Sequence, residues 1–309
     1  MLDIFLQTVP FFALIGLGYG AGRTGFFPPE ATAWLTKFVF YFALTAMLFR
    51  FSATLSLAEV LDWTLIGAYV AATGTIYLLV TLVARLRRLP AAEAAVEAQC
   101  SVIGNVGFLG VPMLVMLMGD AAIGPVMLLL ATDHLVFSSL IVAIITGSRQ
   151  GRLEPAILRT IGLGLIRNPM IVSIALGFAV SGLRLPIPGV ANDFLILLGA
   201  AATPGALFAI GASLADKSAE RLSVAVWLST AKLVLHPAAV AVAMLLIFPV
   251  DRFSAGVAIA AASLPVAGNV FILAQHYGVA PQRVSAAILV STAISVLSVT
   301  LVIGWANPL

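Results

Sequence analysis

The stretch Cys100–Met118 reads CSVIGNVGFLGVPMLVMLM, and its pattern is the strongest indication of the fold. It lies in an apolar run long enough to cross a bilayer, yet it contains three glycines and Pro112. A proline in a helix interior removes one backbone hydrogen bond, here to the carbonyl of Phe108. In lipid no water replaces that lost partner. The stretch therefore predicts a transmembrane helix that is broken within it.

A second interrupted run lies near the other end of the chain. Residues 259–278 read IAAASLPVAGNVFILAQHYG, and Pro265 interrupts their apolar pattern. Both interruptions contain the tripeptide Gly-Asn-Val, at 104–106 and at 268–270. Two interrupted segments in corresponding positions of two halves are the best sequence pointer to a transporter binding site.

Composition places the chain in a membrane. Of its 309 residues, 61% are hydrophobic and only 9% are charged, whereas soluble domains carry roughly 25% charged residues. We expect ten apolar spans, each of about 20 residues, which suits a hydrocarbon core of roughly 30 Å. They are 4–22, 31–49, 61–84, 94–118, 123–146, 163–182, 194–214, 222–248, 255–277 and 284–305. The first ten residues lack a basic region, so no signal peptide is expected.

Lysine and arginine gather in alternate loops. The richer set comprises Arg23, Arg85, Arg87, Arg88, Arg149, Arg152, Arg159, Arg167, Lys217, Arg221 and Arg283, and the poorer set Arg50, Arg184 and Arg252. The positive-inside rule makes the richer side cytoplasmic. We therefore expect a multi-pass protein of a bacterial inner membrane, with both termini outside.

The two halves of the chain repeat. Residues 43–55 (ALTAMLFRFSATL) and 202–214 (ATPGALFAIGASL) share five of thirteen positions at an offset of 159 residues. That offset is close to the 164 residues that separate the two Gly-Asn-Val sites. Because five spans per half is an odd number, the second half is expected to be inverted relative to the first. Such inverted repeats place a site near the midplane, where the two broken spans meet.

Asn105 and Asn269 are the first candidates for binding a substrate. A broken helix leaves free N–H groups at the start of its second piece, and that end suits a carboxylate. An asparagine side chain adds donors without burying a full charge. The alternative is that each asparagine only caps its break. Gln275, just beyond the second interruption, is a further candidate.

Five ionisable residues lie within spans, where each charge costs at least about 2.5–3.5 kcal/mol on insertion scales. They are Asp133 and His134 in span five, Lys232 and His236 in span eight, and Glu97 in span four. Asp133 and Lys232 would form a neutral pair that locks two spans together. Alternatively, Asp133 or His134 carries a coupling proton. Glu97 is the weaker candidate because it lies nearer the cytoplasmic face.

Span one contains Gly16, Gly18, Gly20 and Gly22, which give two overlapping G-x-x-x-G pairs. Such a surface permits close helix approach, in a dimer or within the chain. Other motifs are absent from the sequence: there is no H-E-x-x-H, Walker loop, C-x-x-C or EF-hand pattern, and no G-x-S-x-G. We therefore expect no metal, no cofactor, no enzymatic activity and no nucleic-acid partner.

Four stretches resemble the auxin efflux carrier family, whose architecture is related to that of bile acid–sodium symporters. They are FVFYFALTAMLF (38–49), NVGFLGVPML (105–114), ATPGALFAIGASL (202–214) and SLPVAGNVFILAQHYG (263–278). The resemblance implies ten helices in two inverted five-helix repeats, with spans four and nine broken and crossing. On matching positions the crossing residues are Asn105, Pro112, Pro265 and Asn269. The chain departs from the family at Thr45, where a proline is usual.

The resemblance also implies a static scaffold that dimerises and a mobile transport unit. The scaffold would comprise 1–60 and 163–216, and the transport unit 61–146 and 217–309, with a cytoplasmic linker at 147–162. The short linker favours a bacterial-type carrier of small organic acids over a plant hormone exporter.

We therefore expect a secondary transporter for a mono- or dicarboxylate such as malonate or malate, or an auxin-like acid. It would work by elevator-type alternating access, driven by the membrane potential or a proton gradient. The expected substrate site comprises Gly104, Asn105, Pro112, Pro265, Gly268, Asn269 and Gln275. A sodium-coupled carrier of a larger, bile-acid-like anion is the alternative. A non-transporting receptor or a channel is a less favoured alternative.

Overall fold

The computed structural model describes residues 2–56, 60–150, 155–215 and 222–306, and all regular elements in these ranges are helical. The first half forms α1 (Leu2–Arg23), α2 (Pro29–Phe38), the π-helical turn η1 (Val39–Ala43), α3 (Leu44–Thr54), α5 (Trp63–Leu86), α6 (Ala91–Val102), the π-helical turn η2 (Val106–Gly110), α7 (Val111–Met118), the 3-10 turn η3 (Asp120–Ala122), α8 (Ile123–Thr132), the π-helical turn η4 (Asp133–Ser138) and α9 (Ser139–Gln150). The second half forms α10 (Pro155–Arg167), α11 (Pro169–Gly182), α12 (Gly189–Ala200), α13 (Ala202–Leu214), α14 (Leu222–Thr230), the π-helical turn η5 (Ala231–Leu235), α15 (His236–Val242), the π-helical turn η6 (Ala243–Ile247), α16 (Arg252–Ala262), α17 (Gly268–His276) and α18 (Pro281–Ala306). The all-helical class expected from the sequence is confirmed.

Six continuous helices in the described ranges are long and apolar enough to cross a membrane. A seventh arises if α10 and α11 are one span, although the axis bends by 71° between them. The bend follows from Asn168, which caps α11 by accepting from the Met170 N–H at 3.0 Å, and from Pro169 at the first helical position. The span expected over 163–182 therefore contains a sharp bend at Asn168. The full set of ten spans stays a prediction.

The interruption in the first broken span lies before Pro112 and not at it. Helix α6 ends at Val102, and a new helical segment begins at Val106 and runs through Pro112 to Met118. The wide turn η2 directly precedes α7, which has Pro112 as its second residue. Pro237 stands in the same relation to η5 and α15. A π-helical turn shifts the hydrogen-bond register, so each proline is accommodated without a break.

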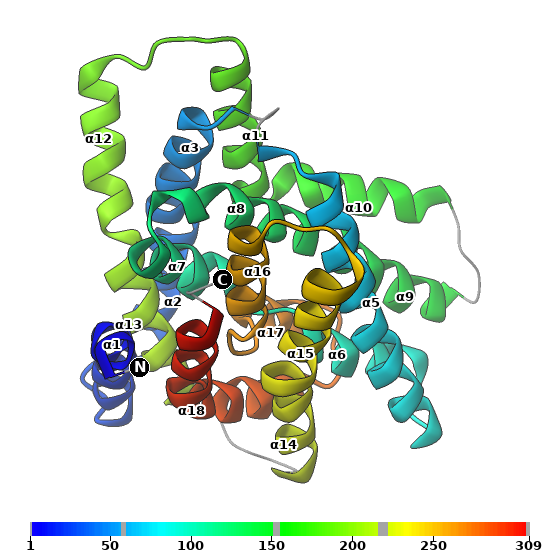
Figure 1. Ribbon diagram of the computed structural model, residues 1–309. Helices are drawn as coiled ribbons and strands as arrows, with labels where there is room; N and C mark the ends of the chain where they lie inside the picture. The colour runs from blue at the N-terminus through cyan, green and yellow to red at the C-terminus, as the bar shows by residue number, and fades with distance from the viewer. Residues whose placement is uncertain (1, 57–59, 151–154, 216–221, 307–309) are drawn as a thin grey trace.

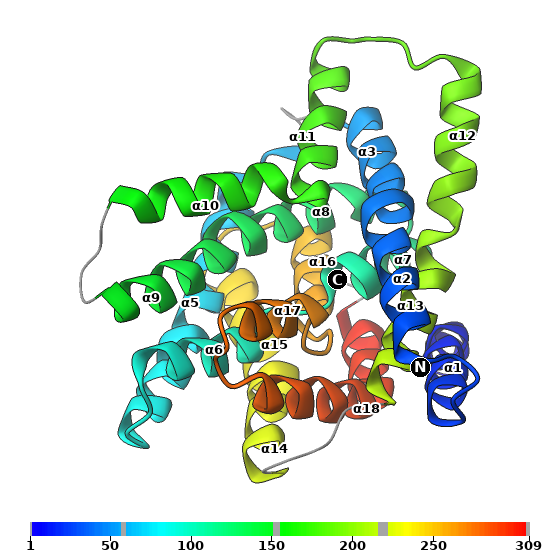
Figure 2. The same cartoon turned by 180° about the vertical axis from the view of Figure 1, so that it is seen from behind.

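The helices pack in two groups, which lie side by side in Figures 1 and 2. In one group α1 packs along α13, and α3 packs along α11 and α12. In the other, α5 packs on α6 and α15, and α18 packs on α14 and α16. Contacts between the groups are made by α1 with α7 and α18, by α13 with η2, and by α9 with α10. Parts of the predicted linker and boundaries (57–59, 151–154 and 216–221) lie outside the described residues.

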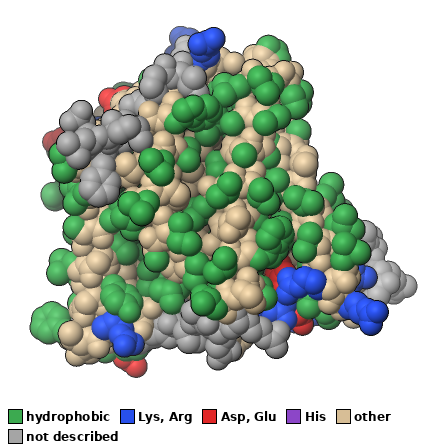
Figure 3. All heavy atoms as spheres, turned by 60° about the horizontal axis from the view of Figure 1, so that its bottom comes forward, with side chains coloured by type: hydrophobic (Ala, Val, Ile, Leu, Met, Phe, Trp, Pro, Cys, Tyr) green, Lys and Arg blue, Asp and Glu red, His purple; other side chains and the backbone are tan. Residues whose placement is uncertain are grey.

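Much of the surface is apolar, as a membrane-embedded protein requires. Figure 3 shows one face on which hydrophobic side chains cover the centre and charged side chains lie at the margins. Leu78 on α5, Leu197 on α12 and Leu246 in η6 are each at least 70% exposed. Lipid tails solvate such side chains, so their exposure needs no protein partner.

The glycines of α1 divide into two faces. A Cβ atom built at Gly18 would lie 2.1 Å from the Phe208 carbonyl oxygen, and one at Gly22 would lie 2.7 Å from the Ala215 Cβ. Gly16 and Gly20 meet nothing within 4 Å. The pair Gly18 and Gly22 is therefore an intramolecular contact with α13.

Replacing Gly18 by alanine is expected to destabilise the protein by about 1–3 kcal/mol, because the methyl group would overlap the α13 backbone. Gly16→Ala is the matched control, since its methyl group meets open space and improves helix propensity. Thermal unfolding of the detergent-purified variants measures the difference. Equal unfolding temperatures for the two variants would contradict the close packing of α1 on α13.

Candidate functional site

The two interruptions are paired with each other. The Asn105 N–H donates to the Pro265 carbonyl at 2.9 Å, and the Ala267 N–H donates to the Ile103 carbonyl at 3.1 Å. These bonds form an antiparallel bridge between Gly104 and Val266. We call the paired segments, residues 103–105 and 263–267, the crossing. An unsatisfied backbone group costs several kcal/mol in a bilayer, so each interruption supplies the partner that the other needs.

A third element secures the crossing. The Val266 N–H donates to Ser291 Oγ on α18 at 3.1 Å, and that hydroxyl donates in turn to the Ile288 carbonyl. Ser291 is fully buried. The crossing is therefore held by hydrogen bonds between its two segments and by a hydrogen bond to α18.

Two helical segments begin at the crossing without a capping side chain. The segment η2–α7 begins after Asn105, and α17 begins after Ala267. The first N–H groups of a helix carry partial positive charge. Gly268, at the start of α17, is exposed, and a Cβ built there meets nothing within 4 Å. The space in front of α17 can therefore admit an anion.

The two predicted asparagines lie at these helix starts. Asn105 is 6% exposed. Asn269 is half-buried, and its Oδ1 atom is buried with no hydrogen-bond partner among the described residues. Neither side chain caps its helix. Both amides therefore keep hydrogen-bonding capacity for a ligand.

The turn η2, which directly follows the crossing, faces the other helix group through apolar side chains. The Phe108 ring stacks on Phe40 from η1, with centroids 6.1 Å apart and planes 8° apart. A Cβ at Gly107 would lie 2.5 Å from Met170 Cε on α11. Sequence reasoning did not identify Phe40, Phe108 or Met170 as site residues, although the first two lie within the stretches that carry the family resemblance.

The remaining predicted substrate residues are dispersed. Pro265 is buried in the crossing, whereas Pro112 is half-buried in α7, beyond η2. Gln275 lies in the last turn of α17 with an exposed side chain, and the structure does not bring it to the crossing. Gln99, in the last turn of α6, is 1% exposed, and neither end of its amide has a partner in the described structure. Gln99 is thus the better-placed amide.

Lys232 and His236 reach the crossing from η5 and α15. The Lys232 ammonium donates to the carbonyl of Ala262, the last residue of α16. It also lies 3.2 Å from His236 Nδ1, and His236 Nε2 lies 3.1 Å from Thr73 Oγ1. Lys232 and His236 are fully buried. A cation at a helix C-terminus is favourable, by up to about 2 kcal/mol in partly buried geometries.

The Asp133 carboxylate is hydrogen-bonded to a tyrosine that was not expected. Its Oδ1 atom accepts from the Tyr69 hydroxyl at 2.9 Å, and its Oδ2 atom is buried without a partner in the described residues. The described ion pairs within 4.0 Å do not include one between Asp133 and Lys232. The neighbouring His134 bonds only locally, through Nδ1 to the Leu130 carbonyl at 2.9 Å.

Tyr69 and Thr73 were missed in the sequence. Both are buried, and they lie four residues apart on α5, so they share one face of that helix. Tyr69 contacts Asp133, and Thr73 contacts His236. Their only signal in the sequence is two polar groups at helical spacing in an apolar span.

Glu97 belongs to a separate ionic cluster. Its fully buried carboxylate lies 2.8 Å from Arg87 Nη1 and 3.2 Å from Arg283 Nη1. Arg283 also lies 2.8 Å from Glu93. The cluster ties α6 in the first half of the chain to α18 in the second. This arrangement favours a structural role for Glu97.

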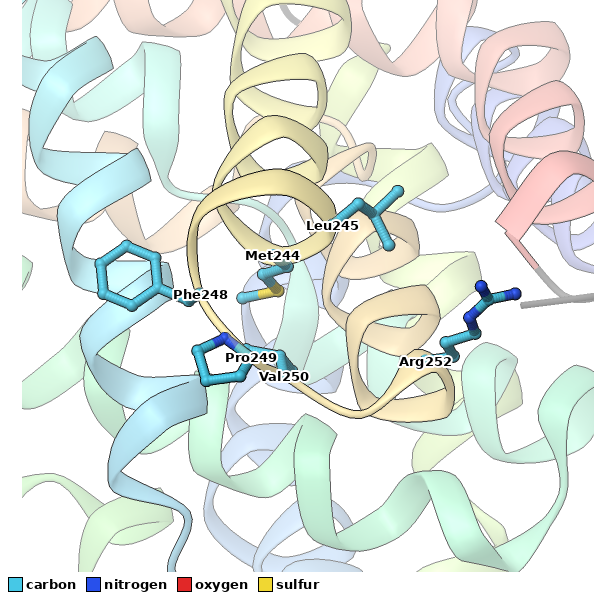
Figure 4. A pocket seen from close by; sticks show the side chains of 6 residues that line it. All are labelled: Met244, Leu245, Phe248, Pro249, Val250 and Arg252. Atoms are coloured by element: carbon cyan, nitrogen blue, oxygen red, sulfur yellow. The ribbon is translucent and has the colours of Figure 1, made fainter.

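A hollow of about 340 Å³ lies elsewhere, between η6 and the start of α16 (Figure 4). It is lined by Met244, Leu245, Phe248, Pro249, Val250 and Arg252. No predicted site residue lines it.

Comparison with known proteins confirms the family resemblance. The family model described as "Membrane transport protein" matches residues 3–303. A protein of Rhizobium meliloti (strain 1021) that is named "Putative malonate transporter" is 33% identical over 306 residues. That match covers 97% of this chain and 95% of the relative.

Glu97→Gln is expected to destabilise the protein, because it leaves Arg283 partly uncompensated in a buried position. Breaking a buried pair costs about 3–5 kcal/mol. We expect a smaller loss of stability here, because Arg87 is 37% exposed and Arg283 keeps its ion pair with Glu93. Glu93→Gln, with a 31% exposed carboxylate, is the control and should cost less. The unfolding temperatures of the two purified variants measure this difference. A Glu97→Gln protein as stable as wild type would show that the cluster does not hold the halves together.

Proposed function

The chain belongs to the membrane transport protein family, and on this premise we propose that it carries a small organic anion across the membrane at the crossing. It is a multi-pass integral membrane transporter and not an enzyme. The observation that supports the crossing as the site is the pair of uncapped helix starts, each with an asparagine that keeps free hydrogen-bonding capacity. Such ends favour negative charge.

The proposed substrate is a small dicarboxylate of the malonate type. The name of the relative supports this choice. The site also suits it, because two helix starts offer donors to two carboxylate groups. The proposed binding residues are Asn105 and Asn269, with Gly104, Pro265 and Gly268 shaping the backbone and Pro112 holding η2–α7. The role of Gln275 in substrate binding stays a prediction, and its exposed side chain does not support it.

The proposed movement follows from the two groups of helices. The group of α1–α3 and α10–α13 would be the scaffold, and the remaining helices, which include the crossing, would be the transport unit. Ten spans in inverted halves, termini outside and a homodimer through the scaffold complete this proposal. The packing of the helices into two groups supports it, since an elevator mechanism requires one group to slide past the other.

The direction of transport depends on charge. An interior-negative potential drives an anion outward with about 2.3 kcal/mol per charge per 100 mV. Efflux therefore needs no coupling ion, whereas import of a dianion needs cations. Asp133, with a buried carboxylate oxygen that has no partner in the described structure, is the proposed proton carrier for import.

The proposal predicts saturable uptake of labelled malonate into proteoliposomes, and loss of that uptake in Asn105→Ala and Asn269→Ala. Each variant removes a donor to a charged ligand, which is worth about 1.5–3 kcal/mol, or roughly a 10- to 150-fold loss of affinity. Asn192→Ala on α12 is the matched control and should transport normally. Unchanged malonate binding in both crossing variants would exclude the crossing as the site, and the absence of uptake by wild type would exclude malonate.

Proton coupling predicts that malonate import rises as the external pH falls, and that Asp133→Asn removes this dependence, because an amide cannot carry a proton. Tyr69→Phe is the comparison, since it removes the hydrogen bond to Asp133 and keeps the carboxyl group. Initial uptake rates over a pH series measure the effect. An Asp133→Asn protein with the wild-type pH profile would assign Asp133 to packing.

A further inference from the structure

The hollow between η6 and α16 has no part in the proposed transport site. Its volume is about 340 Å³, which is at the small end of the range for ligand pockets. Its lining comes from the end of the membrane-crossing helix Leu222–Ile247 and from the segment that leads into α16 (Figure 4). The hollow therefore lies where one span ends and the chain turns into the next helix.

Most of the lining is apolar. Five of the six side chains are aliphatic, aromatic or a thioether: Met244, Leu245, Phe248, Pro249 and Val250. Met244 is 1% exposed and forms the buried part of the lining, whereas Val250 is half-buried. Water gains nothing from such a surface, and apolar groups gain by covering it. This part of the hollow suits a hydrocarbon chain.

The surface beside the hollow is the kind that lipid covers. Leu246 and Ile247, the residues between the lining positions of η6 and the connecting segment, are 79% and 66% exposed. Helix α5, which packs against η6, begins with Trp63, and that side chain is 72% exposed. Tryptophan is enriched at membrane–water interfaces. The hollow is therefore continuous with an apolar surface that ends near the lipid head groups.

The charged side chain of the hollow is Arg252, the first residue of α16. It is exposed, and the ion pairs among the described residues do not include it. The neighbouring Asp251 carboxylate caps α16 by accepting from the Ser254 N–H at 2.8 Å. The planar donors of a guanidinium match the oxygens of a phosphate. The charged end of the hollow is thus available to a phosphate group.

We propose that the hollow binds a membrane phospholipid, with its phosphate on Arg252 and part of one acyl chain against Met244 and Phe248. A free anion leaves the apolar lining uncovered, and a neutral hydrocarbon leaves Arg252 without a partner. An amphiphile at the end of a span satisfies both. Helix α16 runs from Arg252 to Ala262, directly before the crossing. The lipid therefore steadies the far end of a helix that leads into the proposed site.

The test is the unfolding temperature of the detergent-purified protein with one of three additions at equal concentration. Phosphatidylglycerol supplies both parts of the proposed ligand, diacylglycerol with the same chains lacks the phosphate, and sodium phosphate lacks the chains. We expect phosphatidylglycerol to raise the unfolding temperature of wild type by about 3 °C. The other two additions should raise it by less than about 1 °C.

Three variants locate the effect. Arg252→Gln removes the charge and should lose at least about half of the stabilisation by phosphatidylglycerol. Val250→Trp fills the hollow and should lose it although Arg252 is intact. Arg184→Gln is the matched control, because it removes another exposed arginine that does not line the hollow, and it should respond as wild type.

A labelling experiment tests the site without relying on stability. Val250→Cys places a thiol in the lining, and the native Cys100 is fully buried and should not react. Phosphatidylglycerol at about twice its Kd should slow the reaction of the new thiol with a water-soluble maleimide roughly threefold. Diacylglycerol at the same concentration should not.

Each of three results would overturn the proposal. They are equal stabilisation of wild type and Arg252→Gln by phosphatidylglycerol, equal stabilisation of wild type by diacylglycerol or by phosphate alone, and labelling of Val250→Cys that phosphatidylglycerol does not slow. None of these measurements depends on malonate uptake, so the proposed function can fail while this site stands.

Discussion

The constraint on which the structure depends is the need to satisfy every backbone polar group inside a bilayer. A helix that breaks at membrane depth exposes N–H and carbonyl groups where no water can reach them. Here the two interruptions satisfy each other through the Asn105–Pro265 and Ile103–Ala267 hydrogen bonds. Neither interruption is stable without the other. The two halves of the chain are therefore joined at their least regular points, and those points come to lie together in the protein interior.

The existence and approximate positions of the interruptions could be predicted from the sequence, but the role of Pro112 could not. Repeated Gly-Asn-Val within apolar runs indicated two breaks, and the low charge indicated a membrane protein. Pro112 misled the prediction, because a proline breaks a helix only when the hydrogen-bond register is that of a regular α-helix. The wide turn η2 changes that register before Pro112. Whether a chain adopts such a turn depends on packing by neighbouring helices, which residue patterns do not reveal.

The polar partners were also beyond sequence reasoning. Asp133 and Lys232 are complementary charges at similar depths in their spans, which is why a pair was a reasonable hypothesis. The rotation of each helix decides contact, and an apolar span with few polar residues gives little information on rotation. The structure turns Asp133 toward Tyr69 and Lys232 toward the Ala262 carbonyl. Glu97 was identifiable as lying within a span, yet its arginine partners come from a loop and from α18.

The two Gly-Asn-Val tripeptides have different surroundings in the two halves of the chain. This difference determines where positive charge lies at the crossing. Gly104 is packed against Lys232 and the α16 backbone, so a side chain there would crowd the ammonium. Gly268 faces open space, so the start of α17 stays accessible. The Lys232 ammonium lies where α16 ends, and uncapped N–H groups remain where η2–α7 and α17 begin. Both features favour a negative ligand. The two halves thus contribute differently to the crossing, because the second half supplies both the Lys232 ammonium and the open start of α17.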